Sequence, residues 1–165
     1  MSFEIINNPI FTTIQDKGRF GYSHLGVTNS GVMDEYAYIM ANRLLNNPLD
    51  TNILEITLSN LELIASIDTK ISITGATCDF FINDVKKEIW QTHDIKKGDI
   101  LKVGKIHEGN WVYLAVFGGF DIKKEFGSNS TTIKESLGGL DGDKLKKGDI
   151  LPYKSCSDTT KIAIK

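Results

Sequence analysis

Short segments in which apolar and polar side chains alternate run through most of the sequence. The period of two at residues 54–58 and 61–67 is typical of strands that bury one face. Apolar runs bounded by turn residues predict further strands, at residues 71–73, 78–82, 85–90, 100–103 and 111–117. Many short strands at this spacing predict a mainly β chain, folded as a compact barrel or sandwich.

One segment has the period of a helix instead. Apolar residues recur at i, i+3, i+4 and i+7 within residues 33–45, which predicts a single amphipathic α-helix that packs on the sheet. Ser30 or Asp34 can cap its N-terminus, since their side-chain oxygens accept hydrogen bonds from free backbone N–H groups. Pro48 cannot continue a helix, so the helix is expected to end before it.

Length and charge limit the classes of protein that this chain can belong to. Its 165 residues, 41% hydrophobic and 24% charged, suit a single domain over residues 1–165 with its own core. A net charge of −2 lacks the basic footprint of a nucleic-acid binder. No apolar run reaches the roughly 20 residues of a membrane span, and no secretory signal opens the chain. We therefore expect a cytoplasmic protein without nucleic-acid or membrane partners, with Cys78 and Cys156 reduced.

A short motif occurs twice in the sequence. Ile95-Lys96-Lys97-Gly98-Asp99-Ile100-Leu101 is repeated fifty residues later as Leu145-Lys146-Lys147-Gly148-Asp149-Ile150-Leu151. In each copy glycine supplies a positive φ, aspartate caps the turn and two aliphatic residues start a strand. The repeat predicts two similar β-corners in one sheet system and carries no chemistry of its own.

Residues 15–31 form a glycine-bearing segment without periodicity, and it holds several polar side chains that can do chemistry. Such a loop lets the backbone approach a ligand, and its end reaches a helix N-terminus, which favours anions. The alternative is an ordered loop whose polar residues satisfy its own backbone. Arg19 is one of only two arginines in the chain, and its planar fork suits a phosphate, a ligand carboxylate or a structural partner such as Asp16. His24 is either an acid–base group or simply hydrogen-bonded.

A second glycine-rich region covers residues 118–148 and contains seven glycines. Gly118-Gly119 follow a predicted strand, and the later hydroxyl residues can bind an anion through backbone N–H groups or simply form a wide turn. No P-loop sequence is present, so any nucleotide site is of another kind. His93 and His107 lack metal-ligand spacing, so no metal is expected. No lysine lies in a biotin-attachment setting.

Taken together, these motifs resemble a known family. The pattern Thr13-Ile14-Gln15-Asp16-x-Gly18-Arg19 continues through His24, Gly26 and Ser30-Gly31 to Met33-Asp34. It is followed in order by Leu54-Glu55-Ile56-Thr57, Ile73-Thr74-Gly75-Ala76, Gly118-Gly119-Phe120-Asp121, Gly127-Ser128-x-Ser130-Thr131 and Leu137-Gly138-Gly139-Leu140. This order resembles the allophanate hydrolase subunit 2 family, also described as biotin-dependent carboxyltransferase-like, as KipA-like or as the C-type subunit of 5-oxoprolinase.

The resemblance implies a cyclophilin-like β-barrel that acts with a sister subunit (allophanate hydrolase subunit 1, KipI-like, or the B-type subunit of 5-oxoprolinase) and with the A-type subunit of 5-oxoprolinase. The implied activity is an ATP-dependent 5-oxoprolinase, which opens 5-oxoproline to glutamate. Carboxyl transfer to urea or a similar amide is one alternative. A non-catalytic protein that binds the sister subunit, as a KipA-like antagonist of a kinase inhibitor, is another. Family members continue into a second related half, so residues 1–165 are expected to be the N-terminal half.

The resemblance also implies roles for individual residues. The expected mechanism is phosphorylation of the lactam carbonyl by ATP followed by attack of water, with Arg19 holding an anionic group and His24 or Asp16 moving protons. The expected catalytic residues are Asp16, Arg19 and His24. The expected substrate- or nucleotide-binding residues are Gln15, Ser30, Gly31, Asp34, Gly118, Gly119, Ser128, Ser130 and Thr131.

Overall fold

The computed structural model describes residues 1–58 and 60–153, so the predictions for Cys156 and for a strand start at 161–164 lie outside it. Over the described residues the chain is mainly β with one α-helix, as the sequence predicts. The helix α1 covers Glu35–Leu44. The strands are β1 (Ser2–Ile5), β2 (Phe11–Gln15), β3 (Ile53–Thr57), β4 (Leu61–Ala65), β5 (Thr69–Ile82), β6 (Val85–Lys87), β7 (Gln91–Ile95), β8 (Ile100–Val116) and β9 (Ile150–Pro152).

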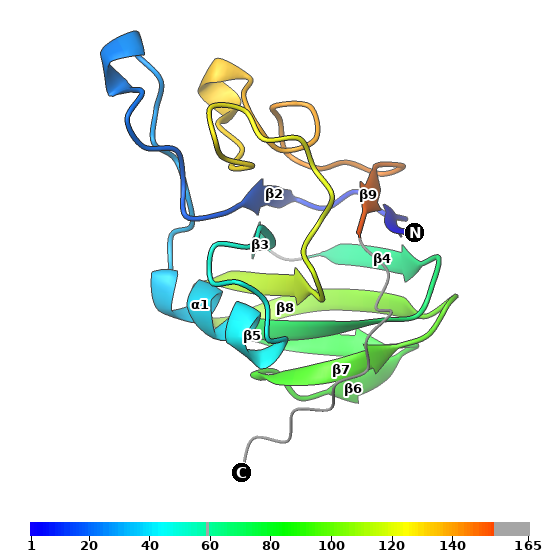
Figure 1. Ribbon diagram of the computed structural model, residues 1–165. Helices are drawn as coiled ribbons and strands as arrows, with labels where there is room; N and C mark the ends of the chain where they lie inside the picture. Colours follow the sequence, from blue (N-terminus) through cyan, green and yellow to red (C-terminus); the bar gives the residue numbers. More distant parts are fainter. Residues whose placement is uncertain (59, 154–165) are drawn as a thin grey trace.

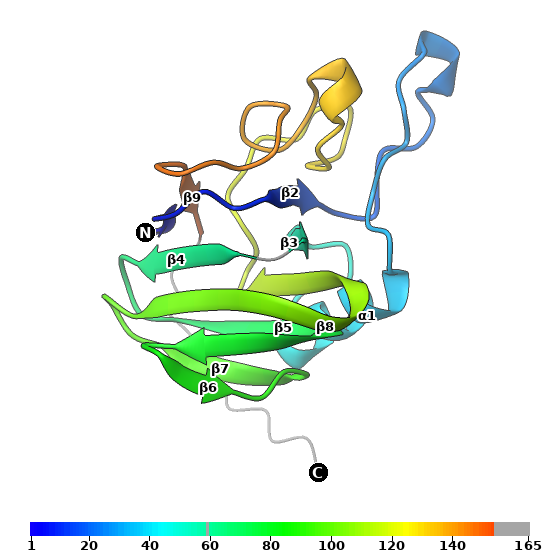
Figure 2. The ribbon, with the colours of Figure 1, turned by 180° about the vertical axis from the view of Figure 1, so that it is seen from behind.

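The strands form a curled antiparallel sheet (Figures 1 and 2). Its order is β2-β3-β8-β4-β1-β9, and β5 pairs with β8 and also carries β6 and β7. The long strand β8 pairs with three others, so it is the centre of the sheet. The sheet encloses a large apolar core, and this half-barrel agrees with the predicted cyclophilin-like barrel.

The two longest strands are continuous where the sequence indicates breaks. Residues 71–73 and 78–82 belong to one strand, β5, which passes through Gly75 with a β-bulge. Gly75 has φ +95°, and a Cβ there would lie 2.3 Å from the carbonyl oxygen of Trp111 on β8. Only glycine allows this close approach, so Gly75 bends a continuous strand instead of ending it. The sequence likewise predicts separate strands at residues 100–103 and 111–117, and β8 joins them.

The helix begins at Asp34 and not at Ser30. The Asp34 carboxylate accepts a hydrogen bond from the Ala37 N–H at 3.0 Å, the geometry of an N-cap. Ala37 and Ala41 are fully buried against the sheet, and their carbonyl groups accept hydrogen bonds from Thr74 and Ser72 of β5. Small residues thus allow close packing of α1 on one sheet face, as Figure 1 shows. Among the residues described, no helix is long and apolar enough to cross a membrane.

The two copies of the Lys-Lys-Gly-Asp motif form nearly identical corners. Gly98 and Gly148 both have φ +88°. The carboxylates of Asp99 and Asp149 accept the N–H of the residue three positions earlier, at 2.8 and 2.9 Å. The prediction of two similar β-corners is confirmed.

The corners are related by an approximate two-fold axis. Gly98 N–H donates to the carbonyl of Ala65 at the end of β4, and Gly148 N–H donates to that of Ile5 at the end of β1. The strands β1 and β4 pair antiparallel around Glu4 opposite Ile64. Because β9 follows the second corner and β8 the first, the order β8-β4-β1-β9 reads the same from either side.

The free thiol of Cys78 is buried on β5. Burial raises its pKa to about 11. The thiol is therefore protonated at neutral pH, which agrees with the prediction of a reduced, unreactive residue.

Candidate functional site

The two glycine-rich regions lie on the same side of the sheet, where the first loop extends beside the loops that follow β8 (Figures 1 and 2). They are joined at their outer ends by the rings of Tyr22 and Phe126, whose centroids are 5.2 Å apart. Thr28 also donates hydrogen bonds to the carboxylate of Glu135 through its N–H and its hydroxyl. Segments about a hundred residues apart thus form one unit.

Asp16 lies at the base of this unit and is only 3% exposed. Its Oδ1 accepts hydrogen bonds from the Gly18 N–H at 2.8 Å and from the hydroxyls of Ser128 and Ser130 at 2.6 and 2.7 Å. Its Oδ2 accepts the Asn129 N–H at 2.7 Å. The predicted anion site of the second loop therefore surrounds a carboxylate that belongs to the chain itself.

Arg19 makes the second connection and is 1% exposed. Its Nη2 donates to the Ser130 carbonyl at 2.5 Å, and its Nη1 donates to the Thr132 hydroxyl at 2.6 Å. Its Nε donates to the Glu125 carbonyl at 3.4 Å. We call Asp16, Arg19, Ser128, Asn129 and Ser130 the loop clamp. Catalytic roles for Asp16 and Arg19 stay predictions; what the geometry describes is a fastening of one loop to the other.

His24 lies apart from the clamp. It belongs to the 3₁₀ turn Ser23–Leu25, at the outer end of the first loop, and is exposed. Within residues 1–58 and 60–153 its side chain makes no hydrogen bond or ion pair. The structure therefore does not bring His24 to Asp16 or Arg19, and a catalytic role for it stays a prediction.

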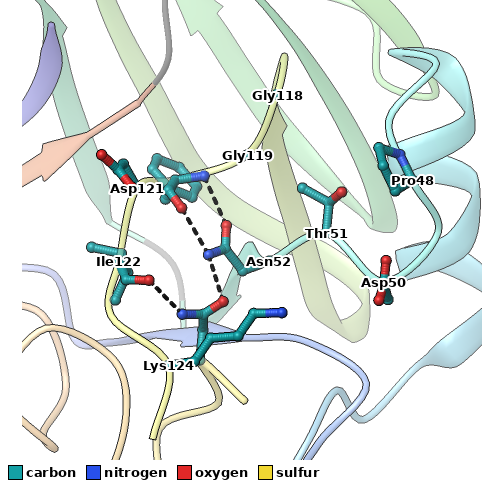
Figure 3. A pocket seen from close by; sticks show the side chains of 11 residues that line it. Pro48, Asp50, Thr51, Asn52, Gly118, Gly119, Asp121, Ile122 and Lys124 are labelled. Atoms are coloured by element: carbon teal, nitrogen blue, oxygen red, sulfur yellow. Dashed lines mark hydrogen bonds between the residues drawn. The ribbon is translucent and has the colours of Figure 1, made fainter. Parts of the chain in front are cut away.

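Gly118 and Gly119 line an open pocket of about 270 Å³ (Figure 3). One wall is the segment 48–52, between α1 and β3, and the other is the segment 118–124 after β8. A Cβ at Gly119 would lie 2.4 Å from the Thr51 methyl carbon, so glycine is needed where the walls meet. Asp50, Asp121, Lys124 and Thr51 bring carboxylates, an ammonium group and a hydroxyl to the lining, which suits a small polar ligand.

Asn52 holds the two walls of the pocket together. It is buried, its Oδ1 accepts the Phe120 N–H at 2.7 Å, and its Nδ2 donates to the Phe120 carbonyl at 2.9 Å (Figure 3). The same Nδ2 donates to the Asn129 side chain at 3.0 Å, and Asn129 in turn donates its N–H to Asp16. The pocket is therefore connected to the loop clamp by a continuous chain of hydrogen bonds.

Three further predicted binding residues meet at one carbonyl group. Gln15 Nε2 donates to the Thr131 carbonyl at 3.1 Å and to the Thr13 hydroxyl at 3.0 Å. The Ser30 hydroxyl donates to the same Thr131 carbonyl at 3.0 Å. Gly31, with φ +109°, lets the chain turn beside the Lys17 carbonyl, which a Cβ would meet at 3.0 Å. The structure thus brings Gln15, Ser30 and Thr131 together.

Glu55 is a candidate site residue that the sequence reasoning missed. It is 4% exposed on β3, and its Oε2 accepts the Met33 N–H and the Tyr113 hydroxyl, both at 2.8 Å. The Tyr113 oxygen accepts the Asp34 N–H at 2.8 Å. Burial raises the pKa of Glu55, and these hydrogen bonds oppose that shift. Its position in an alternating strand indicated a solvent-facing side chain, but α1 and the first loop cover that face.

The glycine-loop N–H groups are already engaged within the chain. Gly18 donates to Asp16, Gly118 donates to the Asn47 side chain at 2.8 Å, and Gly119 donates to the Val116 carbonyl at 3.0 Å. Gly138 donates to the Glu125 carboxylate at 2.6 Å. A phosphate cradle needs such groups free, so these loops do not fit the phosphates of ATP. No group of three or more His, Cys, Asp or Glu in the described ranges is placed to hold a metal ion.

The family model of the carboxyltransferase domain, subdomains A and B, matches residues 25–164. This chain belongs to that family. The membership confirms the resemblance seen in the order of the sequence motifs, and the match includes most of both glycine-rich regions, the pocket and Glu55.

Named relatives of this carboxyltransferase-family chain fall into two kinds. It is 37% identical over 151 residues to the C-type subunit of 5-oxoprolinase from Escherichia coli, covering 90% of this chain and 48% of that protein. It is 38% identical over 141 residues to urea amidolyase of Saccharomyces cerevisiae, covering 85% of this chain and 8% of that protein. The crystal structure of the Kluyveromyces lactis urea amidolyase superimposes with a TM-score of 0.91 at 37% identity, covering 94% of this chain and 9% of that one. The chain thus spans about half of the 5-oxoprolinase relative and under a tenth of these amidolyases.

Proposed function

We propose that this chain is part of the C-type subunit of an ATP-dependent 5-oxoprolinase, which opens 5-oxoproline to glutamate together with a sister subunit of the B type and with the A-type subunit. The observation that supports this most is coverage. The chain spans 48% and 45% of two curated proteins named as C-type subunits of 5-oxoprolinase, at 37% and 33% identity. We further propose that residues 1–165 form the N-terminal half of such a unit.

The geometry divides the labour between this chain and its partners. The pocket between segments 48–52 and 118–124 is large enough for a molecule of the size of 5-oxoproline, and Lys124 supplies a cation for its carboxylate. The loop clamp holds the pocket wall through Asn129 and Asn52, so Asp16 and Arg19 act as positioning residues. Because the glycine-loop N–H groups are engaged internally, the nucleotide is bound by a partner subunit.

A second candidate function is carboxyl transfer to urea or a similar amide. The observation that favours it is sequence identity, because the relatives named urea amidolyase are 36% and 38% identical to this chain, as similar as the 5-oxoprolinase relatives. A regulatory role, in which the chain only sequesters its sister subunit, is the third.

One reconstitution distinguishes these functions. The chain is mixed with the candidate partner subunits, and ADP release is measured with 5-oxoproline, with urea and without either. The proposal expects ADP release that depends on 5-oxoproline and on the presence of this chain. ADP release or carboxyl transfer that depends on urea would favour the second function. A stable complex without stimulated ATP hydrolysis by either compound would favour the regulatory role.

A further inference from the structure

Two acceptor side chains lie side by side on the sheet face that α1 and the first loop cover. Thr13 of β2 is directly opposite Glu55 of β3, and Gln15 is the next residue of β2 on that face. The bond from Gln15 Nε2 to the Thr13 hydroxyl confirms that both point the same way. Glu55 and Gln15 are therefore diagonal neighbours on adjacent strands, close enough to contact one small molecule.

Glu55 presents one carboxylate oxygen that the chain does not use. Its Oε2 is held by Met33 and Tyr113, whereas its Oε1 makes no hydrogen bond within residues 1–58 and 60–153. That oxygen is also absent from the set of sealed polar atoms lacking a partner, so it is accessible to solvent. One half of the carboxylate is thus fixed in place while the other half is free to accept a hydrogen bond.

Gln15 carries the second free acceptor. Its orientation is fixed, because rotating the amide by half a turn would place its oxygen against the Thr131 carbonyl that its Nε2 now contacts. Its Oε1 is sealed from solvent and has no partner among the residues that the structure covers. A buried acceptor without a donor is unfavourable, and native proteins rarely retain one without a reason.

We propose that Glu55 Oε1 and Gln15 Oε1 together form a receptor for the N–H groups of a small neutral amide, that is, a lactam, a urea or a primary carboxamide. Two acceptors on neighbouring strands match a ligand that donates hydrogen bonds and lacks a charge of its own at that end. The inference rests on the proposed function and narrows its substrate to compounds with an amide N–H.

The surroundings of Glu55 suit a neutral donor. The groups that face it are the Tyr113 hydroxyl from β8 and the backbone at Met33 and Asp34, before α1. β2 contributes no ionisable side chain, and no Lys or Arg in the described ranges forms an ion pair with Glu55. Specificity for N–H groups follows because a ligand that offers only acceptors would oppose both oxygens.

The test inverts the free oxygen of Glu55. In Glu55→Gln the amide oxygen can keep the bonds to Met33 and Tyr113, which turns the free position from an acceptor into an N–H donor. Binding of 5-oxoproline and of urea to the full 165-residue chain is measured by calorimetric titration. We expect about tenfold weaker binding of the compound that binds wild type, with little change in Tm, because a donor then faces a donor. Glu62→Gln on β4, a carboxylate paired with Lys102, is the matched control and should bind as wild type.

The pH dependence of wild-type binding provides a readout that needs no variant. Protonation converts the free carboxyl oxygen into a donor in part of the molecules, so binding should weaken as the pH falls through the raised pKa of Glu55. The proposal is overturned if Glu55→Gln binds as tightly as wild type, if neither amide binds wild type, or if ammonium chloride displaces the amide as effectively as urea does. Amide binding that is lost in Glu55→Gln would support it even if the reconstituted complex hydrolyses no ATP, an outcome that would contradict only the proposed function.

Discussion

The Lys-Lys-Gly-Asp corners and the loop clamp use the same two elements with opposite reach. Both combine glycine in the left-handed region with an aspartate carboxylate that accepts backbone N–H groups. In a corner, Asp99 or Asp149 binds an N–H three residues away. In the clamp, Asp16 binds groups more than a hundred residues away. The corners are complete within a short peptide, whereas the clamp exists only once the sheet has formed.

The glycines differ in the same way. No atom of the described residues lies within 4 Å of a Cβ built at Gly98 or Gly148, so those glycines serve the backbone angle alone. A Cβ at Gly138 would lie 2.0 Å from the Ser130 carbonyl oxygen and 2.7 Å from Arg19 Nη2. Glycine in the clamp therefore meets a tertiary constraint that the corners lack.

Replacing the clamp carboxylate should have the largest effect. Asp16→Asn removes the charge and turns one acceptor into a donor that faces hydroxyl or N–H groups, so we expect the free energy of unfolding to fall by about 4 kcal/mol. Chemical denaturation measures this. Asp149→Asn, the corner counterpart, should cost about 1 kcal/mol because a single local hydrogen bond is affected. Equal losses in the two variants would remove the distinction between clamp and corner.

Adding a methyl group inside the clamp should come next. Gly138→Ala forces the Ser130 carbonyl to move, and we expect a loss of about 3 kcal/mol, typical of a severe backbone clash. Gly127→Ala is the control, because Gly127 has φ +76° in the same region but no described atom within 4 Å of its Cβ. It should cost only about 1 kcal/mol, as the strain of the angle alone. A Gly138 variant no worse than the Gly127 variant would show that the clamp is soft.

The planar fork of Arg19 should matter less than Asp16. Arg19→Lys keeps the charge but cannot donate to the Ser130 carbonyl and the Thr132 hydroxyl at the same time, which should cost about 2 kcal/mol. Arg43→Lys, on the exposed side of α1, should change stability by less than about 0.5 kcal/mol. Thermal unfolding of both variants checks the difference. Loss of partner binding in Arg19→Lys without loss of stability would indicate a functional contact instead of a fastening.

The corners should show the smallest and most uniform effect. Gly98→Ala and Gly148→Ala share the same φ and the same free space, so each should cost about 1 kcal/mol, the strain of a left-handed residue. The two values should agree within about 0.5 kcal/mol. Denaturation of both variants under one set of conditions checks this. A difference of several-fold would mean that the two-fold relation between the corners does not extend to their energetics.

The same distinction explains what the sequence could predict. The helix, the alternating strands and the corners depend on nearby residues, and each was predicted correctly in type. The strand β2 was missed because Thr12 and Thr13 are both buried, which removes the alternation. The strand β7 was missed because it is a polar edge strand that pairs only with β5.

The candidate site was predictable as a set of unusual residues but not as a set of contacts. The scarcity of arginine marked Arg19, yet Asp16 was named as its possible partner, and its strongest bonds are to Ser130 and Thr132. Glu55 was passed over because its neighbours along the strand do not reveal that a helix start and a loop cover it. Long-range partners and coverage of a face need the assembled fold.

The approximate two-fold relation around β1 and β4 has a consequence for how the chain is made. β1 contains residues 2–5, and its two neighbours are β4, near residue 63, and β9, near residue 151. During synthesis the first strand emerges long before one of its partners, and one of its edges stays unpaired until almost the whole described chain has left the ribosome. The sheet is therefore closed last by the two ends of the described chain, and removing a few residues at the start would unpair both halves at once.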